Sequence, residues 1–333
     1  MRRKNYKAFY VKKIESVLQK VYLYGTIIHI KGERKMNRAS VFFKASDLFM
    51  HYPRNFEKFP DVTVMKDISY DDRFGYTKGD AFYKEGGASY PVLVNVHGGG
   101  FVRGDKRHRA AWCCKFARQG YFVWNVNYRL APAFKFPAAC EDVINALNFL
   151  PHLQRQFKLD LSKIIITGDS AGAFYAMSAI IAQTNESFRQ GLNLPRLDVS
   201  ISGFMGFCGA YSLEVIVAKK TPFGIAKEVG SALFGYKVKS DFSNLKDFVL
   251  FEYTNLLDFV NEKFPPSFIM ASKVDAFVGG QGELLEEKLK NLNIDYTAYY
   301  AAEKGDAHCF QLLPKHKNTS KVMENAYLWL KNR

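Results

Sequence analysis

The feature that most constrains this chain is an apolar run, residues 164–167, that leads into Gly-Asp-Ser-Ala-Gly at residues 168–172 and then into a helical pattern. In this setting Gly-x-Ser-x-Gly predicts a sharp strand-to-helix turn that exposes the serine hydroxyl at the end of a sheet strand. The flanking glycines permit the strained turn, and the following helix begins with free N–H groups directed at the reacting centre. Ser170 is therefore the candidate nucleophile.

From about residue 61 onward, short apolar or β-branched runs alternate with longer helical stretches. This alternation predicts an α/β fold in which helices cover both faces of a mostly parallel central sheet. The expected strands are residues 92–96, 122–126, 164–167, 199–204, 267–271 and 296–300. The expected helices are residues 137–156, 171–183, 282–291 and 320–331.

A second motif, His-Gly-Gly-Gly at residues 97–100, directly follows one of the expected strands. A flexible glycine loop at the end of a strand suits the second half of an oxyanion hole, which stabilises charge on a carbonyl oxygen. We expect the backbone N–H groups of Gly98, Gly99 and Ala171 to be the donors. His97 belongs to the loop itself, and we expect it to brace the loop by hydrogen bonding.

The partners of the serine are expected further along the chain, because this architecture places them in the order serine, acid, histidine. His308 lies in the loop after the last expected strand, whereas His316 lies in a basic run typical of solvated surface. Asp275 follows the neighbouring strand and is the expected acid. Asp306 is less suitable, since a residue two positions from His308 is poorly placed to hold its far ring nitrogen.

Together these residues resemble the hormone-sensitive-lipase-like branch of the α/β-hydrolases, in which the His-Gly-Gly-Gly loop and the Gly-Asp-Ser-Ala-Gly elbow occur together. The segment Asn-Tyr-Arg-Leu-Ala-Pro at residues 127–132, followed by family-like residues within 136–143, strengthens the resemblance. It covers about residues 60–333. The chain departs from the family at Ala133, where Glu is usual, and at Ala173, where a third elbow glycine is common. Neither position touches the expected chemistry.

The resemblance implies a serine carboxylesterase that hydrolyses short-chain carboxylic esters through an acyl-enzyme. His308 would take the proton of Ser170, and Asp275 would orient and stabilise the imidazolium. Small-molecule esters are the expected substrates, and neither a metal nor an organic cofactor is required. Two alternatives remain open: an amidase, formamidase or peptidase on the same scaffold, and a catalytically silent ligand-binding relative.

Two stretches interrupt the alternation of strands and helices. Residues 1–55 form a basic, helical N-terminal segment, and residues 56–333 form the catalytic domain with an insertion at about 205–263. We expect both stretches to contribute to a cap over the carboxyl ends of the strands, where ligands bind in open α/β sheets. Aromatic side chains near the insertion either wall a short pocket or pack on the core. They are Phe204, Phe207, Tyr211, Phe223 and Phe234.

The net charge of +15 is concentrated at one end, since residues 1–38 hold eleven basic and two acidic side chains. A basic cluster raises nucleic acid or an anionic membrane surface as partners. No nucleic-acid-binding motif accompanies it, so we expect no nucleic acid partner, while peripheral membrane contact by this segment stays open. Charged residues interrupt any signal-like region, and the apolar residues 21–30 are too few to span a bilayer.

The five cysteines are odd in number and lack the paired spacing of a thiolate metal site. Four of them lie in apolar or aromatic surroundings, where cysteine usually acts as a small core residue. We therefore expect reduced thiols without a catalytic role in a cytoplasmic protein.

Overall fold

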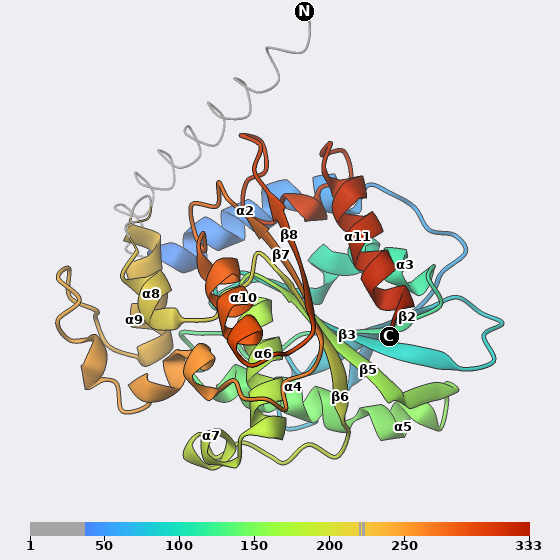
Figure 1. Ribbon diagram of the computed structural model, residues 1–333, viewed down its shortest axis with the longest axis horizontal. Helices are drawn as coiled ribbons and strands as arrows, with labels where there is room; N and C mark the ends of the chain where they lie inside the picture. Colours follow the sequence, from blue (N-terminus) through green and yellow to red (C-terminus); the bar gives the residue numbers. More distant parts are fainter. Residues whose placement is uncertain (1–36, 220, 222–223) are drawn as a thin grey trace, which may run out of the picture.

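The computed structural model describes residues 37–219, 221 and 224–333, and its central feature is an eight-stranded sheet (Figure 1). The strand order is β1-β2-β4-β3-β5-β6-β7-β8. The pairs β1–β2 and β2–β4 are antiparallel, and every other neighbouring pair is parallel. The predicted α/β-hydrolase fold is confirmed. The strands are β1 Thr63–Ser69, β2 Lys78–Tyr83, β3 Tyr90–Val96, β4 Phe122–Val126, β5 Leu159–Asp169, β6 Ile201–Phe207, β7 Ser267–Ser272 and β8 Tyr296–Ala301.

Helices lie on both sides of the sheet, with α3 and α11 on one side and α4 and α6 on the other (Figure 1). The helices are α2 Arg38–Asn55, α3 Ala110–Ala117, α4 Ala138–Asn148, α5 Leu150–Gln154, α6 Ala171–Thr184, α7 Glu186–Gly191, α8 Leu213–Val217, α9 Ile225–Phe234, α10 Gln281–Asn291 and α11 Thr319–Lys331. A short 3-10 turn, η1 (Lys106–Arg109), precedes α3. Because both sheet faces are covered, the central strands are continuous apolar runs, and β4 and β7 are buried at every residue.

The register of the sheet determines where the two motif loops meet. Val96, the last residue of β3, pairs with Gly168 near the end of β5. The glycine loop after β3 and the elbow after β5 therefore begin side by side at one edge of the sheet.

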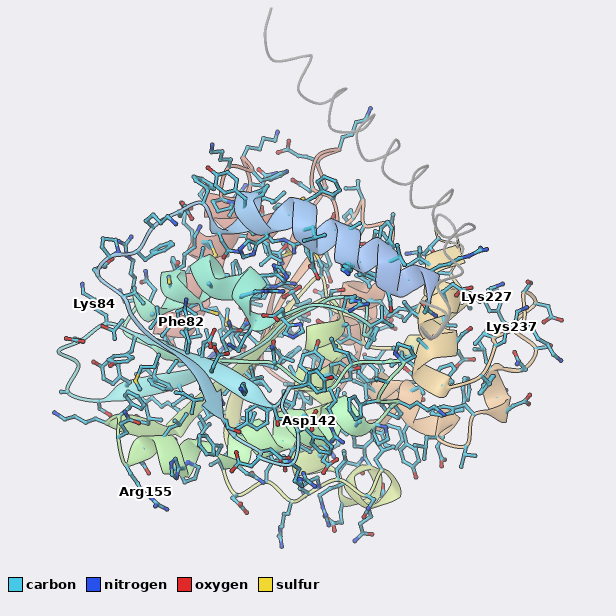
Figure 2. All side chains as sticks on the ribbon, turned by 180° about the vertical axis from the view of Figure 1, so that it is seen from behind. Phe82, Lys84, Asp142, Arg155, Lys227 and Lys237 are labelled. Carbon is cyan, nitrogen blue, oxygen red and sulfur yellow. The ribbon has the colours of Figure 1, made fainter. Side chains whose placement is uncertain are left out.

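Helix α4 anchors the segment Asn-Tyr-Arg-Leu-Ala-Pro, residues 127–132, through contacts with Arg129. The Arg129 guanidinium lies 2.7 Å from Asp142 Oδ1 and 2.6 Å from Glu141 Oε2, and the backbone N–H of Arg129 donates to Asp142 Oδ2 at 2.7 Å. Figure 2 shows Asp142 within the molecule, whereas Lys84 and Arg155 lie at its edge. The next residues return to the glycine loop, since Ala131 donates to the carbonyl of Phe101.

The structure corrects several expected boundaries. Strands β1 and β2 were not expected, because β1 is half-exposed and lacks a continuous apolar run. The expected helix 137–156 divides into α4 and α5 at Phe149, since Pro151 has no N–H for the carbonyl one turn earlier. Strand β6 begins at Ile201 and continues to Phe207, so the insertion starts after that residue and not at 205.

The described part of the N-terminal segment lies against the insertion. Residues 1–36 of that segment fall outside the described residues, and the rest forms α2, capped by the Asn37 side chain, which accepts from Ala39 N–H at 2.8 Å. Asn37 also donates to the backbone carbonyl of Glu228 on α9 at 3.0 Å, so α2 contacts the insertion. Figure 2 shows Lys227 of α9 at the edge opposite Lys84. Within the described chain, every helix is too short or too polar to cross a membrane.

The aromatic side chains assigned to the insertion pack on the core. Phe204, Phe207, Tyr211 and Phe234 are all buried there, and Phe207 packs against Trp112 with ring centroids 5.0 Å apart. Phe223 lies outside the described residues.

Candidate active site

Ser170 lies in a strained turn between β5 and α6, with φ 53° and ψ −122°. Such a backbone is rarely adopted by a non-glycine residue and persists only where its surroundings enforce it. A Cβ at Gly168 would collide with the backbone of Gly172, and a Cβ at Gly172 would collide with the carbonyl of Val96. The Ser170 N–H also donates to Phe207 O on β6 at 3.0 Å. The glycines and this bond therefore fix the elbow.

The structure brings together the three side chains expected to form a triad. His308 Nε2 lies 2.9 Å from Ser170 Oγ, and His308 Nδ1 lies 2.6 Å from Asp275 Oδ2. Asp275 follows β7 and His308 follows β8, so adjacent parallel strands deliver both residues to the edge where β5 ends. Both distances are within hydrogen-bond range.

Backbone amides hold Asp275 in the ionised state. Its Oδ1 accepts from the N–H groups of Phe277 at 2.8 Å and Val278 at 3.0 Å. Burial would raise the pKa of Asp275, but His308 and these N–H groups outweigh it and lower the pKa. Burial likewise opposes charge on His308, but the neighbouring Cys309 sulfur and the Asp275 carboxylate together outweigh burial and raise the pKa of His308 above its usual value of 6.5.

The two groups not chosen for the triad secure the loop that carries His308. Asp306 is fully buried and accepts from Asn318 Nδ2 at 2.8 Å, whereas the His308 ring nitrogens contact Asp275 and Ser170. His316 is not solvated surface as expected, because it is half-buried with Nε2 2.9 Å from the Gly305 carbonyl oxygen.

His97 lies beneath the glycine loop as a neutral brace. Its ring stacks on Tyr128 with centroids 4.4 Å apart, and its Nδ1 donates toward Gly98 O at 3.0 Å. Burial, together with the positive charge of Arg109, lowers the pKa of His97 to about 4. The ring is therefore uncharged at neutral pH.

The expected oxyanion donors differ in their surroundings. The Gly98 amide lies toward the Asp169 carboxylate and helps to lower its pKa. The Gly99 carbonyl accepts from Arg103 N–H at 3.0 Å, which tightens the loop. Gly100, which we did not single out, lines the same pocket as Ser170. Ala171 is the first residue of α6, where backbone N–H groups have no partner within the helix.

A buried ion pair lies directly beneath the elbow. Arg109 Nε and Nη2 donate to the two carboxylate oxygens of Asp169 at 2.6 and 2.7 Å. Burial would raise the pKa of Asp169, but Arg109 outweighs it and lowers that pKa. Helix α2 adds a second pair, in which Arg54 lies 3.5 Å from Asp47, and burial with the charge of Arg109 lowers the pKa of Arg54 to about 10. We did not expect this cluster, because its residues are far apart in sequence.

The pocket at Ser170 and His308 has a cavity volume of about 40 Å³, and its lining is largely apolar. Gly100 and Ser170 line this pocket, so we name the glycine loop and the elbow, residues 97–100 and 168–172, its floor. We name four side chains its apolar wall, one from α2 and three from the insertion. They are Phe43, Ile216, Ile225 and Val229.

One group of possible metal ligands occurs among the residues that the structure describes. It comprises Cys208, His308 and Cys309, whose ligand atoms all lie within 4.8 Å of one another. All five cysteines are buried free thiols, as expected.

Comparison with known proteins supports the assignment made from motifs and fold. The chain is 41% identical over 97 residues to esterase LipI of Mycobacterium tuberculosis, covering 29% of this chain and 30% of that protein. It is 30% identical over 149 residues to ethyl acetate hydrolase of Pseudomonas putida, covering 43% and 46%. The chain thus spans less than half the length of these two relatives.

Among solved structures, esterase B of Lactobacillus rhamnosis superimposes with a TM-score of 0.71 at 19% identity, covering 96% of this chain and 97% of that one. The fold is therefore shared along almost the entire length. The BD-FAE family model matches residues 81–289, which is more than half of the chain and includes the elbow and the acid. The chain belongs to the BD-FAE family and is an α/β-hydrolase of the hormone-sensitive-lipase-like type.

Proposed function

We propose that this protein is a serine carboxylesterase that hydrolyses short-chain carboxylic esters. The observation that carries the proposal is the continuous hydrogen-bonded arrangement of Ser170, His308 and Asp275 at the base of an apolar pocket. A ligand-binding relative has no need for a base placed 2.9 Å from a strained serine. The names of the two curated relatives, an esterase and an ethyl acetate hydrolase, point to the same chemistry.

In the proposed mechanism, His308 Nε2 accepts the proton of Ser170 Oγ as the oxygen attacks the ester carbonyl. Asp275 holds the Nδ1–H of the ring and stabilises the imidazolium. His308 then returns the proton to the leaving alcohol, and water releases the acid from the acyl-enzyme by the same steps.

The oxyanion donors in this mechanism are the backbone N–H groups of Gly99, Gly100 and Ala171. Gly98, which we expected among them, has its amide directed toward Asp169, and this interaction argues against a role as donor. Gly100 replaces it because it lines the pocket together with Ser170. Removing one donor from such a site typically costs about 3 kcal/mol of transition-state stabilisation.

The proposed preference for short acyl chains rests on the pocket. Its cavity volume of about 40 Å³ is far below that of typical small-molecule sites, roughly 300 to 1,000 Å³, so it suits a small acyl group. The apolar wall from α2 and the insertion closes the pocket on the side away from the sheet, and we propose that these two segments act as the cap. The buried free thiols suit a reducing compartment, so we also propose a cytoplasmic location.

The test is hydrolysis of chromogenic acetyl, butyryl, octanoyl and dodecanoyl esters by the wild type and by Ser170→Ala. We expect turnover of the two shorter esters and a loss in kcat on the order of a millionfold in the variant. Ser178→Ala, in the same helix but bonded to a helix carbonyl, is the matched control. A well-folded wild type that cleaves the corresponding anilides but no ester would establish an amidase instead.

A further inference from the structure

Two cysteines lie against the histidine of the triad. Cys309 Sγ is 3.6 Å from His308 Nε2, and the ligand atoms of Cys208, Cys309 and His308 all lie within 4.8 Å of one another. We propose that Cys208, Cys309 and His308 form a binding site for a thiophilic divalent cation such as Zn²⁺ or Cd²⁺, and that the cation inhibits the enzyme.

The donor set and its spacing fit such an ion. Zn²⁺ binds thiolate sulfur at about 2.3 Å and imidazole nitrogen at about 2.0 Å, so tetrahedral ligand atoms lie roughly 3.6 to 3.8 Å apart. The distance from Cys309 Sγ to His308 Nε2 already has this value. Two cysteines and one histidine leave a fourth position open, which water or the Ser170 hydroxyl occupies.

The surroundings of His308 also match those of a zinc ligand. A ligating histidine usually donates its other ring N–H to a carboxylate, which fixes the tautomer and makes the ligand more basic. Asp275 Oδ2 lies 2.6 Å from Nδ1 and supplies this interaction. The residue that orients the base for catalysis therefore also orients it for metal binding.

The backbone holds both thiols in place. Cys208 has φ 45° and Cys309 has φ 55°, which are uncommon values for residues other than glycine. Cys208 N–H donates to Met270 O at 2.7 Å, so its position is tied to β7. Both cysteines are buried, and His308 lines the pocket, so the cation enters by the route of the substrate.

Binding releases one proton from each thiol to solvent as the two sulfur–metal bonds form. The metal occupies the Nε2 lone pair that would accept the proton of Ser170, so hydrolysis stops. This inhibition rests on the proposed function, whereas the binding itself does not.

To test the proposal, the full chain is titrated with Cd²⁺ or Zn²⁺ in a buffer that contains a phosphine reductant, and two quantities are measured. The first is the ultraviolet charge-transfer absorbance of cadmium thiolate, and the second is ester hydrolysis in the presence of Zn²⁺. We expect one equivalent of Cd²⁺ to saturate the absorbance and a chelator to restore the activity lost with Zn²⁺. Cys208→Ser and Cys309→Ser should each weaken binding at least about tenfold.

Controls separate this site from other thiols. Cys113→Ser and Cys140→Ser remove buried cysteines on α3 and α4 and should leave binding and inhibition as in the wild type. Asp275→Asn should weaken Cd²⁺ binding by about 10- to 100-fold, which absorbance reports even when hydrolysis is lost. Unchanged binding in both Cys208→Ser and Cys309→Ser would overturn the proposal. A wild type that binds Cd²⁺ but cleaves no ester would contradict the esterase alone.

Discussion

The floor of the pocket and its apolar wall are held in place by different kinds of interaction. In the floor, Ser170 is fixed at φ 53° by three features. They are glycines at positions with no room for a Cβ, directed backbone hydrogen bonds and a buried bidentate ion pair. The wall consists of side chains such as Ile225 and Val229, which contribute volume and no directed bond. Chemistry requires fixed angles between reacting atoms, whereas selection of an acyl chain requires only a shape. We therefore expect changes in the floor to affect rate and folding, and changes in the wall to affect substrate choice.

The largest expected effect on this contrast comes from Asp275→Asn. Without the carboxylate, the His308 tautomer is no longer fixed, and we expect kcat to fall about 10⁴-fold. The Cys309 sulfur and the Asp275 carboxylate both raise the pKa of His308 above its usual 6.5. Because the base must be neutral, wild-type kcat/KM should rise as the pH passes this raised pKa. In the variant this rise should move to lower pH. Asp306→Asn is the control, since Asp306 bonds to Asn318, and an equal shift there would contradict the assignment.

The next effect tests the ion pair beneath the elbow. Arg109→Met leaves Asp169 as a buried charge without its bidentate partner, and we expect a loss of roughly 3 to 5 kcal/mol in the free energy of unfolding. Adding Asp169→Asn should recover part of this loss, which denaturant titration measures as a double-mutant cycle.

Arg118→Met provides a matched control for that cycle. Arg118 makes a similar two-nitrogen contact with Asp61, but at an exposed site where solvent screens the charges, so its loss should be much smaller than the loss at Arg109. Equal losses at Arg109 and Arg118 would remove the proposed distinction between the floor and the rest of the molecule.

A third prediction concerns acid and the brace under the glycine loop. The folded state binds a proton at His97 only near pH 4, whereas the unfolded chain binds it near 6.5. The unfolded state therefore holds more protons between these values, and stability falls as pH drops through this window, by about 3 kcal/mol for His97 when complete. The free energy of unfolding of His97→Asn should depend less steeply on pH in this window. An unchanged slope would show that His97 is not the group responsible.

The smallest expected effect comes from a substitution in the apolar wall. Val229→Ala enlarges the pocket, and we expect kcat/KM for longer acyl chains to rise relative to acetyl by about 10-fold or more per added fitting methylene. Val249→Ala is the control, because Val249 belongs to the insertion but is 90% exposed. A loss of rate with every ester and no change in preference would mean that Val229 belongs functionally to the floor.

Structural features that depend on neighbouring residues in the chain could be predicted from the sequence. Strands such as β4 and β7 were predictable because continuous burial requires continuous apolar runs. Chain order and strand ends predicted that Ser170, Asp275 and His308 lie together, and the structure places Asp275 and His308 within hydrogen-bond distance. Strand β1 was missed because half-exposed antiparallel strands carry polar residues.

Features formed by distant segments could not be predicted. Nothing near Arg109 in the sequence indicates a partner 60 residues away at Asp169. The convergence of Cys208 with Cys309 depends on the order of β6, β7 and β8 in the sheet, which residue spacing does not reveal. The contribution of Phe43 to the pocket likewise follows from the packing of α2 against α9.

The origin of the apolar wall has a consequence for how such a protein diversifies. Phe43 comes from a helix that precedes the sheet in the chain, and the other wall residues come from one insertion between β6 and β7. Both segments are peripheral to the order in which the strands are connected. Recombination or loop exchange at these two places can therefore replace the apolar wall as a unit, while the strand framework continues to hold Ser170, His308 and Asp275 together.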